Sequence, residues 1–208
     1  MSLFPSRPYD GAGAYAADYF DLYREGAAKV DRNALDAAGR LLAERAAQGQ
    51  MIFSCGNGGS AAISNHLVCD CLKGVRANSL LKPKVHSLST TVELLTAIIN
   101  DIGSEDMFSF QLESLAGPAD VLIAISSSGT SPNIIKALTW AKANGMATIA
   151  MTGFSGGEAA KLADISLHVP IDNYGVVEDI HQSLMHILAQ YLRQAHITDA
   201  TLLGSLKF

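Results

Sequence analysis

Cationic residues and cysteines are few in this 208-residue chain, and long apolar runs are missing. Fifteen Lys and Arg against 20 Asp and Glu give a formal charge of −5, which argues against a nucleic-acid partner. No apolar run approaches the roughly 20 residues that span a bilayer, so we expect no membrane partner. Three cysteines form no even disulfide framework, and the start lacks the layout of a secretion signal. These absences together predict a cytoplasmic protein.

Short apolar runs alternate with helical patterns from residue 51 onward. Strands are predicted near 51–55, 84–88, 121–126, 146–151 and 165–169. Helices are predicted near 60–73, 91–100, 105–115, 131–144, 157–163 and 177–195. Fully apolar strands separated by helices indicate a parallel sheet that is covered on both faces. We therefore predict an α/β protein with a three-layer α/β/α sandwich.

Two Ala-rich helices are expected ahead of the sheet, over Gly13–Ala28 and Ala34–Ala47, with Asp31 as the N-cap of the second. We divide the chain into a helical extension (1–50), a sheet domain (51–197) and a tail (198–208). The extension must bury its apolar stripes either on a partner subunit or on its own domain. The first alternative predicts a homo-oligomer.

Two turns rich in small polar residues follow predicted strands. Ser54–Ser60 reads S-C-G-N-G-G-S, and Ser126–Ser131 reads S-S-S-G-T-S. Each could be only a tight connection, because glycine and asparagine tolerate positive φ. Two such turns at helix N-termini favour a phosphate site built from backbone N–H groups and hydroxyls. Neither contains the lysine of a P-loop, so the predicted ligand is a phosphorylated small molecule.

Polar side chains recur at helical spacing on two predicted helices. His66 and Asp70 share one face, and Glu178, Gln182 and His186 form a stripe on the last helix. Two such helices can assemble four N and O ligands suited to Zn²⁺. Each residue alone could equally be a solvated side chain.

The motifs G-N-G-G-S, I-S-S-S-G-T-S and M-T-G, with Ile99-Asn100-Asp101 and the long last helix, resemble the sugar isomerase (SIS) domain family. Within it, the chain is most similar to phosphoheptose isomerases. The resemblance implies a flavodoxin-like sheet, a cytoplasmic homotetramer and one Zn²⁺ per subunit. It implies the interconversion of sedoheptulose 7-phosphate and D-glycero-D-manno-heptose 7-phosphate through an enediolate, as in heptose biosynthesis for lipopolysaccharide.

The resemblance also implies roles for individual residues. The metal ligands would be His66, Asp70, Glu178 and His186, and the catalytic groups Asp70, Glu178 and His186. The substrate-binding residues would be Asn57, Gly58, Gly59, Ser60, Asp70, Asn100, Asp101, Ser126, Ser127, Ser128, Ser131 and Glu178. The chain departs from the family at four of its positions: Asp70 replaces Glu, Glu178 replaces Gln, and Gly74 and Gly175 replace a basic and an acidic residue.

An alternative from another functional class stays open. SIS domains also serve as non-catalytic sensors or adaptors of phosphosugars, including a regulator of bacterial replication initiation. A binding module needs the serine turns but has no use for four convergent N and O ligands. Their presence favours the isomerase.

Overall fold

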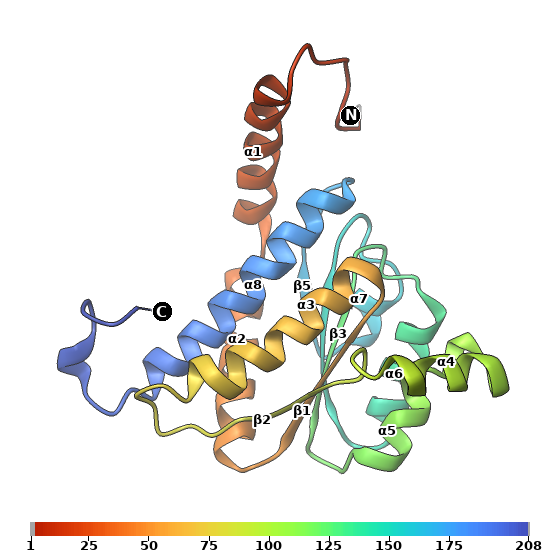
Figure 1. Cartoon of the computed structure of the whole chain (residues 1–208), viewed down its shortest axis with the longest axis vertical. Coiled ribbons are helices and arrows are strands. Elements are labelled where there is room, and N and C mark those ends of the chain that lie inside the picture. The colour runs from red at the N-terminus through yellow and green to blue at the C-terminus, as the bar shows by residue number, and fades with distance from the viewer. Residues whose placement is uncertain (1–2, 208) are drawn as a thin grey trace.

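A single parallel sheet organises the protein, and the computed structural model describes residues 3–207 (Figure 1). Its strands are β1 (Met51–Gly56), β2 (Lys84–Ser87), β3 (Val121–Ser126), β4 (Ala147–Thr152) and β5 (Ile165–His168). They lie in the order β2-β1-β3-β4-β5, and every pairing is parallel. The predicted strands and the predicted α/β class are confirmed.

Helices cover both faces of this sheet (Figure 1). They are α1 (Ala12–Lys29), α2 (Arg32–Ala47), α3 (Gly58–Cys69), α4 (Val92–Asp101), α5 (Ser109–Leu115), α6 (Pro132–Ala143), α7 (Ala159–Leu162) and α8 (Tyr174–Ala195). One core, which includes Leu42, Ile63 and Leu184, joins α2, α3 and α8 to the sheet. A second, which includes Phe108 and Leu138, joins α5 and α6 to the opposite face. The three-layer sandwich is therefore confirmed.

The two N-terminal helices pack against their own sheet domain over much of their length. Asp31 caps α2 as predicted, because its carboxylate accepts from the N–H groups of Asn33 and Ala34. Gly26 of α1 lies against the side chain of Ile180, so even a methyl group there would collide with it. Further toward the N-terminus of α1, Phe20 remains 66% exposed. The predicted domain boundary at residue 50 and a subunit contact through α1 remain predictions, and residues 1–2 lie outside the described part.

Three local features differ from the expectations. The helix expected over 105–115 is a 3₁₀ turn (η2, Ser104–Asp106) followed by the separate helix α5. The helix after β1 is expected to run to residue 73, but it ends in a π-helical turn (η1, Asp70–Val75). The tail contains a 3₁₀ turn (η3, Ala200–Leu202) and is held where Arg193 donates to the carbonyl of Lys207. Residue 208 of the predicted tail lies outside the described residues.

The carboxyl edge of the sheet brings the two polar turns together. β1 and β3 are neighbours, and Gly56 at the end of β1 pairs with Ile125 near the end of β3. The turns that lead into α3 and α6 therefore lie side by side, where open α/β sheets bind their ligands. Among residues 3–207, none of the helices has the length and apolar character needed to cross a membrane.

Candidate active site

A small polar pocket lies between the two turns and the start of α8, with a volume of about 130 Å³. Its lining residues are Asn57, Ser60, Ile125, Ser126, Ser127, Ser128, Ser131, Tyr174 and Glu178. Seven of these nine residues belong to the substrate-binding set that the resemblance implies, and the other two are Ile125 and Tyr174. Neither Lys nor Arg lines this pocket in the described chain, so an anion there must be held by hydroxyls, amides and helix N-termini.

Glycines give the two turns their shape. Gly58 begins α3 with φ +52°, and Gly129 lies between the serines and α6 with φ +66°. A side chain on Gly129 would also collide with the carbonyl group of Gly156. Both positions need the left-handed conformation that glycine adopts readily. The tight turns leave the first N–H groups of α3 and α6 near the pocket.

Ser127 carries the clearest sign of a missing polar ligand. Its residue is only 5% exposed, and its hydroxyl has no hydrogen-bond partner among the described residues. A buried hydroxyl without a partner is destabilising, and such groups in native proteins require a specific explanation. Since Ser127 lines the pocket, a phosphate oxygen bound there could supply the missing acceptor.

Glu178 places one carboxylate at this pocket. It lies directly over the backbone of Gly59, so that a Cβ at Gly59 would collide with its carboxylate. Burial, followed by the neighbouring negative charge of Asp179, raises the pKa of Glu178 above its ordinary value. A carboxylate that retains its proton more readily is suited to proton transfer.

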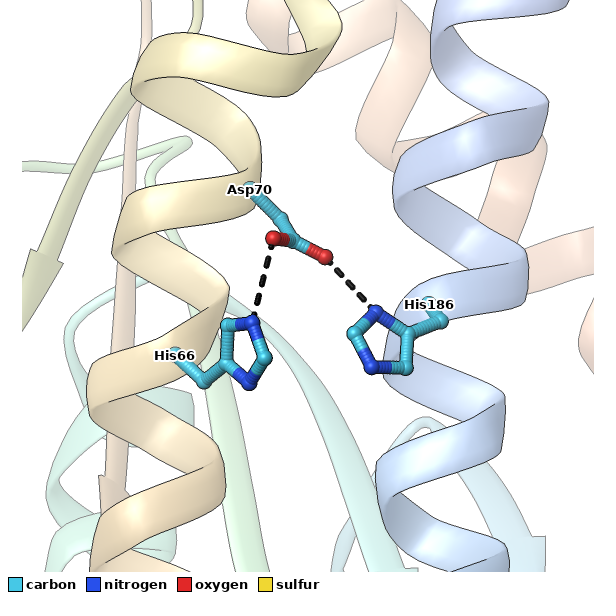
Figure 2. A group of neighbouring side chains, drawn as sticks. All are labelled: His66, Asp70 and His186. Atoms are coloured by element: carbon cyan, nitrogen blue, oxygen red, sulfur yellow. Dashed lines mark hydrogen bonds and ion pairs between the residues drawn. The ribbon is translucent and has the colours of Figure 1, made fainter. Parts of the chain in front are cut away.

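A closed ring of four side chains joins α3 and η1 to α8. Asp70 contacts both imidazoles, through Oδ2 to Nδ1 of His186 at 2.7 Å and through Oδ1 to Nε2 of His66 at 3.3 Å (Figure 2). Gln182 closes the ring, since its Nε2 lies 3.2 Å from Nδ1 of His66 and 2.9 Å from Nε2 of His186. The side chains come from helices that are adjacent only in the folded protein.

One arrangement of protons satisfies this ring. Nδ1 of His186 can donate to Oδ2 of Asp70, and Nε2 of His66 faces Oδ1 of the same carboxylate, while the other nitrogen of each ring can accept from the amide of Gln182. Two neutral imidazoles and a carboxylate are also the ligands that a divalent transition metal prefers. Their donor atoms lie within 4.8 Å of one another, so the three residues fit a metal ion.

The structure brings three of the four predicted metal ligands together and separates the fourth. His66, Asp70 and His186 form the donor group, whereas Glu178 is absent from it and lines the pocket. Gln182, which the sequence placed only on the polar stripe, joins the ring instead. The sequence feature that points to Gln182 is its position midway between Glu178 and His186, about one helical turn from each.

Asn100 and Asp101 lie apart from the predicted substrate site. Both are exposed at the C-terminal end of α4, where the amide of Asn100 donates to Asp101 at 2.7 Å, and neither lines the pocket. Gly175 is exposed, but a Cβ there would lie only 3.1 Å from the hydroxyl oxygen of Tyr19. That hydroxyl donates to Asp179, so the N-terminal helix reaches the start of α8.

His181 lies beneath the site on the side of α8 that faces the sheet. The residue is fully buried, and burial lowers the pKa of its imidazole to about 4. Charge repulsion from His168 on β5 lowers the pKa of His181 further. His181 is therefore a neutral core residue that supports α8.

Comparison with known proteins agrees with this geometry. The family model described as the SIS domain matches residues 14–153. The phosphoheptose isomerase of Maridesulfovibrio salexigens is 40% identical over 153 residues, which cover 74% of each chain. That of Vibrio cholerae is 37% identical over 161 residues, 77% of this chain and 83% of its own. The structure of phosphoheptose isomerase GmhA from Neisseria gonorrhoeae superimposes with a TM-score of 0.79 at 32% identity, covering 86% of this chain and 95% of that one. The chain thus belongs to the SIS domain family and, within it, to the phosphoheptose isomerases.

Proposed function

We propose that this protein is an aldose–ketose isomerase that interconverts sedoheptulose 7-phosphate and D-glycero-D-manno-heptose 7-phosphate. The observation that carries the proposal is the coexistence of a cation-free phosphate pocket with an acid–base and metal-type cluster on the adjoining helices. A sensor or adaptor needs only the pocket. The named activity of the relatives supports the same substrate class.

The serine turns would hold the phosphate group. Ser126, Ser127, Ser128 and Ser131 offer hydroxyls, and the N-terminus of α6 adds free N–H groups. Asn57 and Ser60 would bind oxygens of the sugar from the α3 side. Asn100 and Asp101 stay on the list of predicted sugar contacts, although within one described chain they lie outside the pocket lining.

Glu178 is the better placed of the two proposed bases, because it lines the pocket and its pKa is raised. It would take a proton from the carbon next to the carbonyl and return it to the neighbouring carbon, through an enediolate. A second proton moves between the two oxygens, and His186 is the proposed carrier. Both oxygens of Asp70 contact imidazoles, so we assign Asp70 to orienting His66 and His186.

His66, Asp70 and His186 would hold the Zn²⁺ that the family implies, with Glu178 or Gln182 as a further ligand. When bound, the ion would supply a Lewis acid for the oxygens of the enediolate. The two roles of His186 exclude each other at one nitrogen, because a lone pair bound to an ion cannot accept a proton. Whether turnover depends on the metal therefore tests whether His186 acts as a metal ligand or as the proton carrier.

The likeness to phosphoheptose isomerases also supports a proposed homotetramer in the cytoplasm. We propose that Phe20, which is exposed in the N-terminal half of α1, contacts a partner subunit.

The decisive experiment is to incubate chelator-treated protein with sedoheptulose 7-phosphate, with and without Zn²⁺, and to follow new aldose signals by NMR. Zinc-stimulated turnover is expected, and Asp36→Ala, which changes an exposed acid on α2, should leave it intact. Folded protein that binds the sugar phosphate without converting it, in either condition, would refute the isomerase and favour the sensor.

A further inference from the structure

Two asparagine amides connect the turn before α3 to the start of α6. Nδ2 of Asn57 donates to Oδ1 of Asn133 at 3.0 Å, and Nδ2 of Asn133 donates to Oδ1 of Asn57 at 2.9 Å. The residues are 76 positions apart, and Asn133 is only 8% exposed. Asn57 is exposed and lines the pocket. The reciprocal pair therefore ties a pocket residue to a buried one.

The pair is not an ordinary helix cap. Asn57 occupies the N-cap position of α3, where an asparagine side chain usually accepts from an N–H of the first helical turn. Here its side chain makes no such capping bond. The amide is hydrogen-bonded to Asn133 instead, so the pairing with Asn133 in place of a capping bond needs an explanation.

Contacts with neighbouring atoms determine the orientation of the two amide groups. Oδ1 of Asn133 also accepts from the backbone N–H of Ile134 at 3.0 Å, and its Nδ2 donates to the sulfur of Met107 at 2.9 Å. Exchanging the oxygen and nitrogen of Asn133 would oppose an N–H to the N–H of Ile134. Because Asn133 can take only one orientation, its partner Asn57 is restricted to one as well.

The hydrogen-bonding capacity of the two amides differs. Each asparagine amide offers two N–H donors and two acceptor lone pairs. Asn133 uses both donors, on Asn57 and Met107, and its oxygen accepts from Asn57 and Ile134. Asn57 uses one donor and one lone pair on Asn133. One N–H and one lone pair of Asn57 therefore remain for a ligand, in an orientation set by Asn133.

We infer that Asn133 is a positioning residue that acts on substrate only through Asn57. It holds the Asn57 amide so that a donor and an acceptor lie next to each other at the pocket. Vicinal hydroxyls of a sugar match such a pair, since each hydroxyl can both donate and accept. The inference rests on the proposed function for its substrate class.

A double-mutant cycle with sedoheptulose 7-phosphate separates this role from a structural one. Asn57→Ala and Asn133→Ala should each lower kcat/KM by about tenfold or more, because a misplaced contact lowers the rate steeply. In the Asn57→Ala background, Asn133→Ala should lower it by less than about twofold. Losses that multiply would overturn the inference. Asn144→Ala is the matched control, since Asn144 is an exposed asparagine at the other end of α6.

Side-chain amide NMR signals test the pair without substrate or turnover. In the wild type, the Asn57 amide should show two widely separated proton shifts, because only one of its protons is bonded to Asn133. Asn133→Asp keeps the shape but replaces the donor by an acceptor, and it should shift the Asn57 signals strongly. Unchanged Asn57 signals in both Asn133 variants would overturn the inference. A wild type inactive on the sugar phosphate would refute the proposed function, while this measurement still decides on the pair.

Discussion

The serine pocket and the ring of His66, Asp70, Gln182 and His186 both involve α3 and α8, but they differ in how they are built and in the polar groups that they present. The pocket is built from short stretches of chain at the ends of adjacent strands, and its donors are neutral. The ring joins side chains from α3 and η1 to side chains from α8. Two imidazoles and one carboxylate in it can exchange protons or bind a cation, whereas the amide of Gln182 cannot exchange protons in this way. Under the proposed function, the serine turns would bind the phosphate, whereas the ring, together with Glu178 at the pocket, would carry the acid–base chemistry.

This division predicts that changes in the ring act mainly on kcat and changes in the pocket mainly on KM. Asp70→Ala should have the largest effect, a loss of about a thousandfold in kcat, because both imidazoles lose their shared acceptor. Steady-state kinetics should show KM changed by less than about threefold. Zinc content, measured on the same samples, should fall as well. A variant with normal kcat would show that the ring is structural.

Glu178→Gln tests the group that lies between the two regions. The substitution keeps the size of the side chain but removes the proposed base, so kcat should fall by about a hundredfold. The same change removes the only acidic side chain among the described residues that line the pocket, so the Kd for sedoheptulose 7-phosphate should fall severalfold. Calorimetric titration beside kinetics would separate the two effects. A weaker affinity together with a lower zinc content would instead identify Glu178 as a metal ligand.

Ser127→Ala should raise KM by about tenfold and leave kcat nearly unchanged, because one phosphate contact is lost. Its effect on stability should be unusual for a buried site. The Ser127 hydroxyl has no partner among the described residues, so its removal should leave the free energy of unfolding unchanged or slightly higher. Urea denaturation of the free protein measures this. A loss above about 1 kcal/mol would mean that the hydroxyl is bonded within the protein.

His181→Phe should have the smallest effect on catalysis and a visible effect on acid stability. The folded pKa of about 4 lies below the ordinary 6.5, so the unfolded chain binds the proton more tightly. The contribution of this neutral imidazole is complete above pH 6.5 and is lost as the pH falls toward 4. Wild-type stability should therefore decline in this window more steeply than that of the variant. Equal pH dependence of the free energy of unfolding in the two proteins would show that His181 binds its proton as readily in the folded protein as in the unfolded chain.

The same contrast between pocket and ring explains what the sequence could predict. Ser126–Ser131 follows directly on an apolar strand, so its place at the carboxyl edge depends only on recognising that strand. Asp31 could be identified as a cap for the same local reason. The partner of Asp70 depends instead on the rotation of α8 against α3. A polar stripe with residues at 178, 182 and 186 leaves that rotation open, so the sequence does not show which of them contacts His66 and Asp70.

The π-helical turn and the asparagine pair were missed for a related reason. The turn Asp70–Val75 packs against α8, and its sequence, Asp-Cys-Leu-Lys-Gly-Val, contains no local pattern that predicts a π-helix. Asn133 is the second residue of α6, and nothing in the local sequence connects it with Asn57. Contacts between distant side chains depend on the packed fold, whereas the strand-to-helix turns are local.

One regularity connects α8 with the helix after β1. Gln182 with His66, His186 with Asp70, and Arg193 with Ala77 are each separated by 116 residues. The segment 66–77, which comprises the end of α3, η1 and the turn after it, thus runs parallel to α8 with a constant offset in residue number. Loops between them could lengthen without disturbing the offset, but one residue deleted within α8 would rotate the following side chains by about 100°. The cluster of His66, Asp70, Gln182 and His186 therefore depends on the register between these two helices more than on the length of the intervening chain.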